Sequence, residues 1–268
     1  MVKEYTEAAR TTPQESFGAN GHGGPRRANG HAPLSDNARV IMEKRYLRTN
    51  AEGKQESPED LFRRVARAIA EGEIEDARPM WEGRYYDLLT SLKFLPNSPT
   101  LVNAGTGRGC LSACFVVSPD DTIESIMEVA HDAAMIEKWG GGIGFGLSKL
   151  RAKNDMIRTT HGEACGPIAV MKLYSSVGAT LTQGAFRLGA HMGQLRDSHP
   201  DVREFIHCKD GDDTLQNFNI SVQITDEFMR AVDADADWDL INPRDTGQGP
   251  ANEVVGTVSA RELWDEIA

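Results

Sequence analysis

The sequence is poor in cysteine, in aromatic residues and in basic charge. It has 4 cysteines in 268 residues, 7% aromatic residues, and 29 lysines and arginines against 40 aspartates and glutamates, a net charge of −11. Cysteines this sparse do not make a disulfide framework, so a cysteine that matters here should matter through its reactivity. The acidic balance argues against a nucleic-acid or anionic-membrane binder, which would normally carry a basic face.

Long apolar runs are missing as well. No run approaches the roughly 18 residues of a membrane span, and the N-terminus lacks the apolar core of a signal peptide, so we expect a cytoplasmic protein. Residues 1–31 contain neither Leu nor Ile and are rich in glycine. Such a segment cannot bury enough apolar area to offset its ordering entropy, which predicts a flexible tail over residues 1–33. Its histidines, His22 and His31, are not predicted to form a metal site.

Helical spacing begins after the tail. Apolar residues make up 40% of the chain, as in a globular protein. Ser57 has the position of an N-cap, Pro58 that of a first helical residue, and Leu61, Phe62 and Val65 follow at helical spacing. The sequence therefore predicts a helical lobe over residues 34–95.

From residue 96 onward, short strand-like runs alternate with amphipathic helices. This alternation is typical of an α/β domain built from crossover units. Ser259 is the predicted N-cap of the last helix. The candidate strands are 113–117, 143–147, 189–195, 218–224 and 238–241, and the candidate helices are 122–138, 167–181, 201–208, 226–232 and 259–268.

The glycine-rich run Gly140-Gly-Gly-Ile-Gly-Phe-Gly146 is the most conspicuous motif. It matches neither the G-x-G-x-x-G fingerprint nor a Walker sequence. The run follows a predicted helix and enters a predicted strand. Glycines there allow close approach of either another strand or a ligand, and both interpretations stay open.

Cys110 and Cys114 form a C-x₃-C pair, which without a second pair is a weak zinc signal. In an extended segment their Cα atoms would lie about 13 Å apart, too far for a disulfide. Taken alone, Cys114 would be an inert cysteine buried in an apolar strand. Cys165 and Cys208 have no supporting context.

Several charged residues admit both a structural and a binding interpretation. Asp121, with Glu124 three residues later, is predicted to be the N-cap of a helix. Arg151, Arg158 and Arg187 lie in predicted loops, and arginine on a loop is ordinarily solvated. In so acidic a protein, however, basic loops would also suit a phosphate ligand, whose oxygens a guanidinium matches in pairs.

Five segments then stand in order along the chain: 95–105 (LPNSPTLVNAG), 111–114 (LSAC), 140–146, 182–190 (TQGAFRLGA) and 218–222 (FNISV). In order and spacing they resemble the large catalytic chain of ribonucleotide reductases, most closely the adenosylcobalamin-dependent class. The resemblance covers about residues 36–268. It implies a ten-stranded α/β barrel made of two five-stranded halves, of which residues 96–268 would hold roughly the first.

The resemblance also implies roles for individual residues. Cys114 matches the first of two reducing cysteines, which acts as the ribose 2′-hydroxyl leaves. Substrate-contacting positions match Ser98, Thr100, Ala113 and Gly142. A deoxynucleoside triphosphate effector site at a subunit interface matches Asp121, Thr122, Ile123, Arg151 and Arg158, and the loop that carries its signal to the active site matches Gln183 to Arg187.

Two departures from the family pattern stand out. The signalling loop, QGAFRLG, is less basic and less glycine-rich than in many relatives. The radical-bearing cysteine of the family lies in an Asn-Pro-Cys-Gly-Glu segment, whereas the one Asn-Pro here, Asn242-Pro243, is followed by Arg244. We therefore expect the N-terminal portion of a reductase, truncated or interrupted in its gene, for example by an intein, and inactive on its own.

The partners implied by the resemblance are a ribonucleotide, di- or triphosphate, a deoxynucleoside triphosphate effector, a thioredoxin-like reductant and a second copy of the chain. Two alternatives stay open. One is the diiron-dependent class, with a separate radical-generating subunit. The other is a non-catalytic effector-binding or dimerisation module, against which Cys114 counts, since such a module has no use for a reducing thiol.

Overall fold

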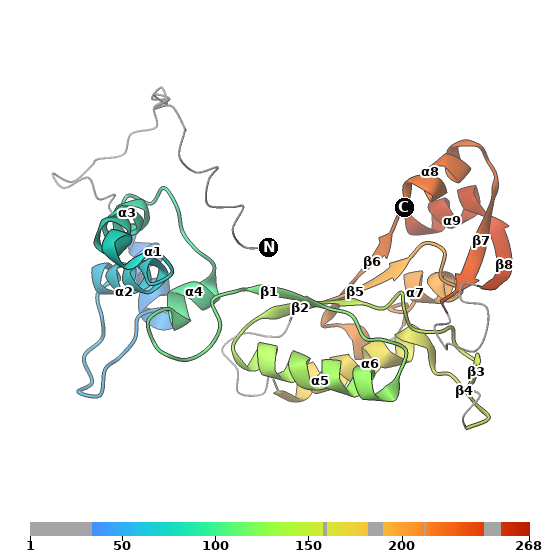
Figure 1. Cartoon of the computed structure of the whole chain (residues 1–268), viewed down its shortest axis with the longest axis horizontal. Helices are drawn as coiled ribbons and strands as arrows, with labels where there is room; N and C mark the ends of the chain where they lie inside the picture. The colour runs from blue at the N-terminus through green and yellow to red at the C-terminus, as the bar shows by residue number, and fades with distance from the viewer. Residues whose placement is uncertain (1–33, 158–159, 182–189, 212, 244–252) are drawn as a thin grey trace.

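The computed structural model describes residues 34–157, 160–181, 190–211, 213–243 and 253–268. Three parts follow one another along the molecule: a helical lobe, a parallel sheet with helices against it, and a small C-terminal unit (Figure 1). The predicted tail, residues 1–33, lies outside the described residues. No helix within the described ranges is long and apolar enough to cross a membrane.

The helical lobe begins at Asp36 and confirms the helical spacing of this region. Ser57 caps α2 in a capping box: its hydroxyl accepts from Asp60 N, and the Asp60 carboxylate accepts from Ser57 N. The lobe core gathers Leu61, Phe62, Val65, Leu89 and Leu101. Its helices are α1 (Asp36–Arg45), α2 (Pro58–Ala70), η1 (Glu75–Ala77), α3 (Arg78–Thr90) and α4 (Ser98–Asn103).

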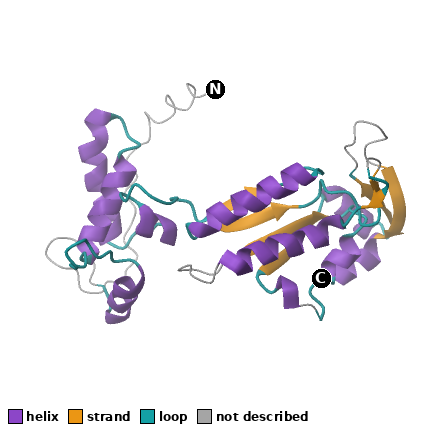
Figure 2. Cartoon of the chain, turned by 90° about the horizontal axis from the view of Figure 1, so that it is seen from below, coloured by secondary structure: helices purple, strands orange, loops and turns teal. Residues whose placement is uncertain are grey.

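The middle part is a four-stranded, all-parallel sheet in the order β1-β2-β5-β6, which confirms the predicted α/β architecture. The helices that connect its strands pack on one face of the sheet (Figures 1 and 2). The elements are β1 (Cys114–Val117), α5 (Ile123–Lys138), β2 (Gly142–Gly146), α6 (Gly166–Leu181), β5 (His191–Arg196), α7 (Val202–Ile206), η3 (Asp213–Leu215) and β6 (Phe218–Gln223).

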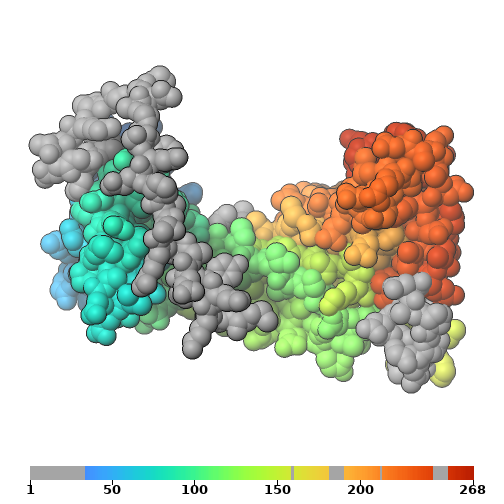
Figure 3. Space-filling view, turned by 45° about the horizontal axis from the view of Figure 1, so that its top comes forward, coloured from blue at the N-terminus to red at the C-terminus, as the bar shows by residue number. Residues whose placement is uncertain are grey.

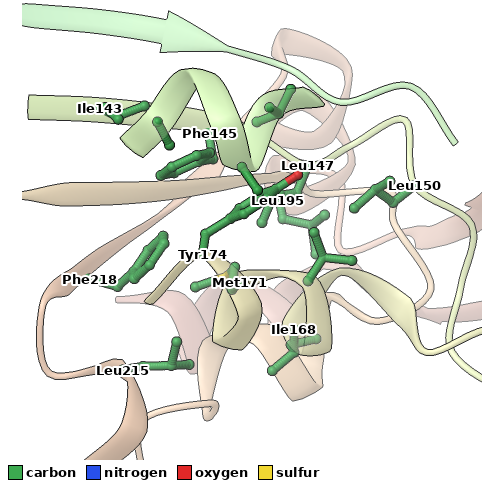
Figure 4. Packing of buried hydrophobic residues seen from close by; sticks show 14 of the residues in the cluster. Ile143, Phe145, Leu147, Leu150, Ile168, Met171, Tyr174, Leu195, Leu215 and Phe218 are labelled. Atoms are coloured by element: carbon green, nitrogen blue, oxygen red, sulfur yellow. The ribbon is translucent and has the colours of Figure 1, made fainter. Parts of the chain in front are cut away.

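Phe145 lies at the centre of the covered face and is fully buried. Its ring stacks on Tyr174 of α6 with centroids 4.7 Å apart and lies 5.6 Å from the Phe218 ring of β6 (Figure 4). Ile143 and Leu195 join it from β2 and β5. Because successive side chains of a strand point to opposite faces, the residues that precede and follow each of these in the strands lie on the other face of the sheet.

That opposite face, called the open face below, carries little bulk. Its β2 positions are the glycines of the glycine-rich run, and Val116 beside them is 79% exposed. Cys114 shares this face on β1, and Met192 and Gln194 share it on β5. Purely parallel sheets are ordinarily covered on both faces, so the open face is a surface built to meet further groups.

The C-terminal unit packs against α7 of the middle part, and a small core joins Val202 of α7 to Phe228, Val232, Ala260 and Leu263. Figure 3 shows it at the end of the molecule far from the lobe. Ser259 caps the last helix, accepting from Glu262 N as predicted. The unit contains α8 (Asp226–Asp233), β7 (Asp237–Asn242), β8 (Glu253–Ser259) and α9 (Ala260–Ile267).

Two antiparallel pairings were not predicted. Strand β8 pairs with β7 across a segment that lies outside the described residues. The other pairing joins β3 (Met156–Ile157) to β4 (Gly162–Glu163), strands too short to show an apolar alternation. His161, between the two strands, has φ +56, a left-handed conformation that is uncommon outside glycine but that histidine adopts more often than most residues.

Candidate functional site

Cys114 lies at the N-terminal edge of the sheet as the first residue of β1. Its thiol is free and the residue is exposed, so it is not the buried core cysteine that an isolated apolar strand would suggest. Gly142 is its partner on β2, and Gly142 N donates to the Ala113 carbonyl over 2.7 Å. The structure thus brings Cys114, Ala113 and Gly142, three of the predicted site residues, side by side.

The surroundings of Gly142 show why this position of the glycine-rich run is a glycine. A Cβ added there would come within 3.1 Å of the Ala190 carbonyl oxygen, so neighbouring backbone already approaches it closely. Gly144 has room, with nothing nearer than 3.7 Å. Only Gly140, before the strand, has a positive φ within this run, at +81. Backbone packing therefore accounts for Gly142, and Gly144 leaves the open face accessible.

Ser98 and Thr100 lie at the start of α4, where the lobe meets the sheet. The Thr100 hydroxyl is buried and donates to the Leu111 carbonyl over 2.6 Å, which ties α4 to the segment before β1. The Ser98 hydroxyl is hydrogen-bonded to the Tyr46 hydroxyl over 3.0 Å. Ser98 lines a pocket of about 510 Å³, called the lobe pocket, with Arg45, Tyr46, Asn103, Glu137 and Trp139 among its other walls.

A buried acid and base, missed by the sequence analysis, lie behind this edge. Glu137 in the last turn of α5 is hydrogen-bonded to Nε2 of His191, the first residue of β5, and the two are 4% and 2% exposed. Oε2 of Glu137 and Nδ1 of His191 have no partner. A Cβ on Gly178 of α6 would come within 2.6 Å of the His191 ring, so glycine is required there. No spacing rule links two residues 54 positions apart.

A second pocket, of about 610 Å³, lies beyond the opposite edge of the sheet; we call it the loop pocket. Four predicted effector residues line it together, although Arg151 is far from the others in sequence: Asp121, Thr122, Ile123 and Arg151. Leu150, Cys165 and Gly166 are among its other walls. The remaining predicted residues of this site, Arg158, Gln183 and Arg187, lie outside the described residues.

Asp121 and Arg151 form the charged pair of the loop pocket. Arg151 Nε donates to Asp121 Oδ2 over 2.6 Å, and the two side chains are 18% and 13% exposed. The prediction that Asp121 caps the helix is wrong. Thr122 is the N-cap of α5, with its hydroxyl accepting from Ser125 N over 3.1 Å, and Asp121 is left free to bind Arg151.

The neighbouring lysines behave as ordinary surface charges. Lys149 pairs with Asp120 over 2.7 Å with both side chains more than 60% exposed, and Lys153 pairs with Glu204. Such exposed pairs contribute little to stability. Arg151 differs from them because its pair is largely shielded from water. Among the described residues, no group of three His, Cys, Asp or Glu side chains could hold a metal ion.

Comparison with known proteins identifies the family. Residues 112–268 match the family model described as ribonucleotide reductase, barrel domain, and residues 33–109 match the ribonucleotide reductase all-alpha domain. The chain belongs to the ribonucleotide reductase large-chain family. The resemblance stated from the motifs is thereby confirmed. The helical lobe is the all-alpha domain of that family, and the parallel sheet with its helices is part of its barrel.

Reductases with known names show how much of a complete protein this chain represents. The vitamin B12-dependent ribonucleoside-diphosphate reductase of Thermoplasma acidophilum is 46% identical over 185 residues, which are 69% of this chain and 23% of that protein. The protein of the same name from Mycobacterium tuberculosis H37Rv is 38% identical over 239 residues, 87% of this chain and 33% of that protein. A ribonucleoside-diphosphate reductase subunit alpha of Synechocystis is 32% identical over 231 residues. The chain thus spans about a quarter to a third of the length of these B12-dependent relatives.

Proposed function

We propose that this reductase chain provides one reducing thiol and the nucleotide-selecting pocket of an enzyme that converts ribonucleoside diphosphates to deoxyribonucleotides. The observation that carries the proposal is the placement of Cys114. It is a free, exposed thiol on the open face of the sheet, beside β2 glycines that carry no side chains, of which Gly144 also has room above it. The diphosphate is proposed because the B12-dependent relatives are ribonucleoside-diphosphate reductases.

The chemistry assigned to Cys114 needs a second thiol. When the ribose 2′-hydroxyl leaves as water, two electrons and two protons pass from two thiols to the sugar, and the thiols become a disulfide. A thioredoxin-like dithiol then reduces that disulfide for the next turnover. The exposure of Cys114 supports this role, because thiol–disulfide exchange requires direct access to sulfur.

Adenosylcobalamin is proposed for the complete enzyme from the names of the relatives, and identity is higher to the B12-dependent proteins than to the Synechocystis subunit alpha. When bound, the cofactor would supply the radical that the family resemblance assigns to a cysteine. The residues of this chain do not complete such a site: the Asn-Pro-Cys-Gly-Glu segment is absent from the 268 residues, and neither pocket contains Cys114.

The loop pocket is proposed to bind a deoxynucleoside triphosphate effector. Its volume of about 610 Å³ is in the range of small-molecule sites. Arg151 offers a shielded guanidinium for phosphate, and Asp121 is a hydrogen-bond acceptor for sugar hydroxyls.

The exposed side of α5 supports a homodimer. Ile123, Met127 and Met135 are 76%, 52% and 44% exposed on this one helix. They follow one another at helical spacing, and Ile123 also lines the loop pocket. A second copy packed on this stripe would bury it and would place the loop pocket next to the subunit interface.

The experiment that tests the catalytic role is Cys114→Ser in the complete enzyme. We expect multiple turnover with a dithiol reductant to be abolished, because serine cannot form the disulfide, while folding is unchanged at this exposed position. Deoxynucleotide formation from a ribonucleoside diphosphate is the measurement, and Cys110→Ser, four residues away, is the control. Turnover at the parental rate in the Cys114→Ser enzyme would refute the assigned role.

A further inference from the structure

The four consecutive residues 150–153, which follow β2, are held by side chains from other parts of the fold. Each of the four has one main-chain group bound by a different side chain. The bonds join His199 Nε2 to the Leu150 carbonyl (2.8 Å), Arg151 N to Asp121 Oδ1 (3.2 Å), Ala152 N to Asn242 Oδ1 (3.1 Å) and Lys153 N to Asp201 Oδ2 (2.8 Å).

The side chains that hold this segment are themselves fixed. His199 Nδ1 accepts from Asp201 N over 3.0 Å, so its Nε2 carries the proton and donates to the Leu150 carbonyl. The turn that contains His199 is joined to the C-terminal unit, because the Ser198 carbonyl accepts from Ile241 N over 2.7 Å. Asn242 is the next residue along β7. The turn after β5 and the end of β7 therefore form one polar bracket around residues 150–153.

Two side chains of the bracket, His199 and Asn242, are buried, and the bracket does not line the loop pocket. His199 and Asn242 are each 2% exposed, and neither they nor Asp201 line that pocket. Gly166, which does line it, packs directly on the bracket. A Cβ on Gly166 would come within 3.0 Å of both Asp201 Oδ2 and Lys153 N. The segment 150–153 thus connects the bracket to the pocket wall, which it forms in part through Leu150 and Arg151, and Gly166 at the start of α6 lies next to both.

We propose that Asn242, His199 and Asp201 are positioning residues for anion binding in the loop pocket. They hold the backbone of residues 150–153, and with it the Arg151 guanidinium, in the geometry that receives phosphate. This inference rests on the proposed function of the pocket. A charged donor held in place before the ligand arrives loses less freedom on binding, so affinity depends on residues that never contact the ligand.

Asn242→Ala is the direct test. It removes the acceptor of Ala152 N, 90 positions away in sequence, without changing the pocket wall. We expect the affinity for whichever of dATP, dGTP, dCTP and dTTP bind the parental chain to fall about three- to tenfold, the loss of one hydrogen bond.

Val232→Ala separates positioning from general destabilisation. Val232 is a core residue of the same C-terminal unit, so its truncation loosens that unit without removing any bond to residues 150–153. Nucleotide affinity should then stay at the parental value. Parental affinity in Asn242→Ala, or an equal loss in Val232→Ala, would overturn the proposal.

Amide hydrogen exchange on the chain without nucleotide distinguishes failure of this inference from failure of the proposed function. If the parental chain binds none of the four nucleotides, the proposed effector role fails. The exchange rates then still show whether Asn242 holds the backbone of residues 150–153. Exchange at Ala152 N should accelerate about tenfold or more in Asn242→Ala relative to Val232→Ala. Equal exchange rates in the two variants would show that Asn242 does not hold the segment.

Discussion

The two edges of the parallel sheet are organised by different forces. At the N-terminal edge, Cys114 and Gly142 present a thiol and bare backbone, fixed by packing of the strands on the aromatic core. Beyond the C-terminal edge, residues 150–153 are fixed by hydrogen bonds from distant side chains. The first edge should therefore respond to changes in its buried core, including the Glu137–His191 pair, and the second to the loss of single hydrogen bonds to its backbone.

Phe145→Ala should produce the largest effect because Phe145 supports both edges. Truncating a buried phenylalanine leaves a cavity that costs about 3 to 5 kcal/mol in the free energy of unfolding. Urea denaturation of the parental and variant chains measures the difference. Val116→Ala, on the neighbouring strand but 79% exposed, is the control and should stay within about 0.5 kcal/mol. Equal effects in the two variants would mean that the aromatic cluster does not carry the sheet.

Glu137→Leu should damage the N-terminal edge alone. It leaves His191 buried without its partner, and breaking a buried pair costs about 3 kcal/mol or more. The double variant Glu137→Leu/His191→Leu should recover most of that loss, because an apolar replacement of a buried pair is often neutral. Denaturation of both variants is the measurement. The loop pocket should keep its nucleotide affinity in both the single and the double variant. A loss of affinity in either variant would show that the two edges are coupled.

Arg151→Ala should affect the C-terminal edge alone. Loss of a charge-assisted contact to phosphate should weaken effector binding by about 1.5 to 3 kcal/mol. Calorimetric titration with the four deoxynucleoside triphosphates measures it. Lys149→Ala is the control, because it removes one positive charge from the same loop. The Lys149 side chain is exposed and paired with Asp120, so the nucleotide affinities of this variant should equal those of the parental chain. Indistinguishable titrations for the two variants would show that Arg151 does not contact the effector phosphate and has only a structural role.

The smallest effect expected is a pH dependence located at the bracket. Burial lowers the pKa of the His199 imidazole, so the folded state disfavours its proton. The contribution of neutral His199 to the free energy of unfolding is fully present above its unfolded-state pKa, near 6.5. This contribution is lost as the pH falls from there through the lower folded-state pKa, by up to about 1.4 kcal/mol per pH unit. Burial also raises the pKa of the Asp197 and Asp201 carboxyls, whose protonation favours the folded state as the pH falls.

His199→Gln should isolate that contribution. The amide keeps a donor near the Leu150 carbonyl but does not titrate, so the fall in unfolding free energy between pH 7 and pH 5 should become shallower than in the parental chain. Urea midpoints at several pH values give the slope. His131→Gln removes a histidine that is exposed on α5 and should leave the slope as it was. Parallel slopes for all three proteins would contradict the assignment to His199.

The N-terminal edge was largely predictable from local signals. Short strand-like runs located β1 and β2, and the glycine-rich run marked the entry to β2. Local signals also predicted helix starts elsewhere, at Ser57 in the lobe and at Ser259 in the C-terminal unit. The Asp121 cap failed because Thr122, equally able to cap, stands one residue closer to the helix. The lesson is that a polar residue before a helix can be recruited by a distant charge.

The C-terminal edge could not be predicted by such rules. The resemblance placed Asp121 and Arg151 in one site, but their ion pair and the bracket join residues 30 to 90 positions apart. Asn242 and His199 carry no pattern of their own, and their roles exist only once β5 and β7 are in place. The roles assigned to Cys114, Ser98 and Thr100 stay predictions, and the Cys114→Ser experiment on the complete enzyme addresses the first of them.

The four parallel strands lie in the sheet in the same order in which they occur along the chain. A nascent polypeptide emerging from the ribosome would therefore always add its newest strand to the outer edge of those already formed. The intervening helices pack on one face, so no segment has to thread past another. Assembly could proceed stepwise during translation, with the C-terminal unit closing the bracket around residues 150–153 last.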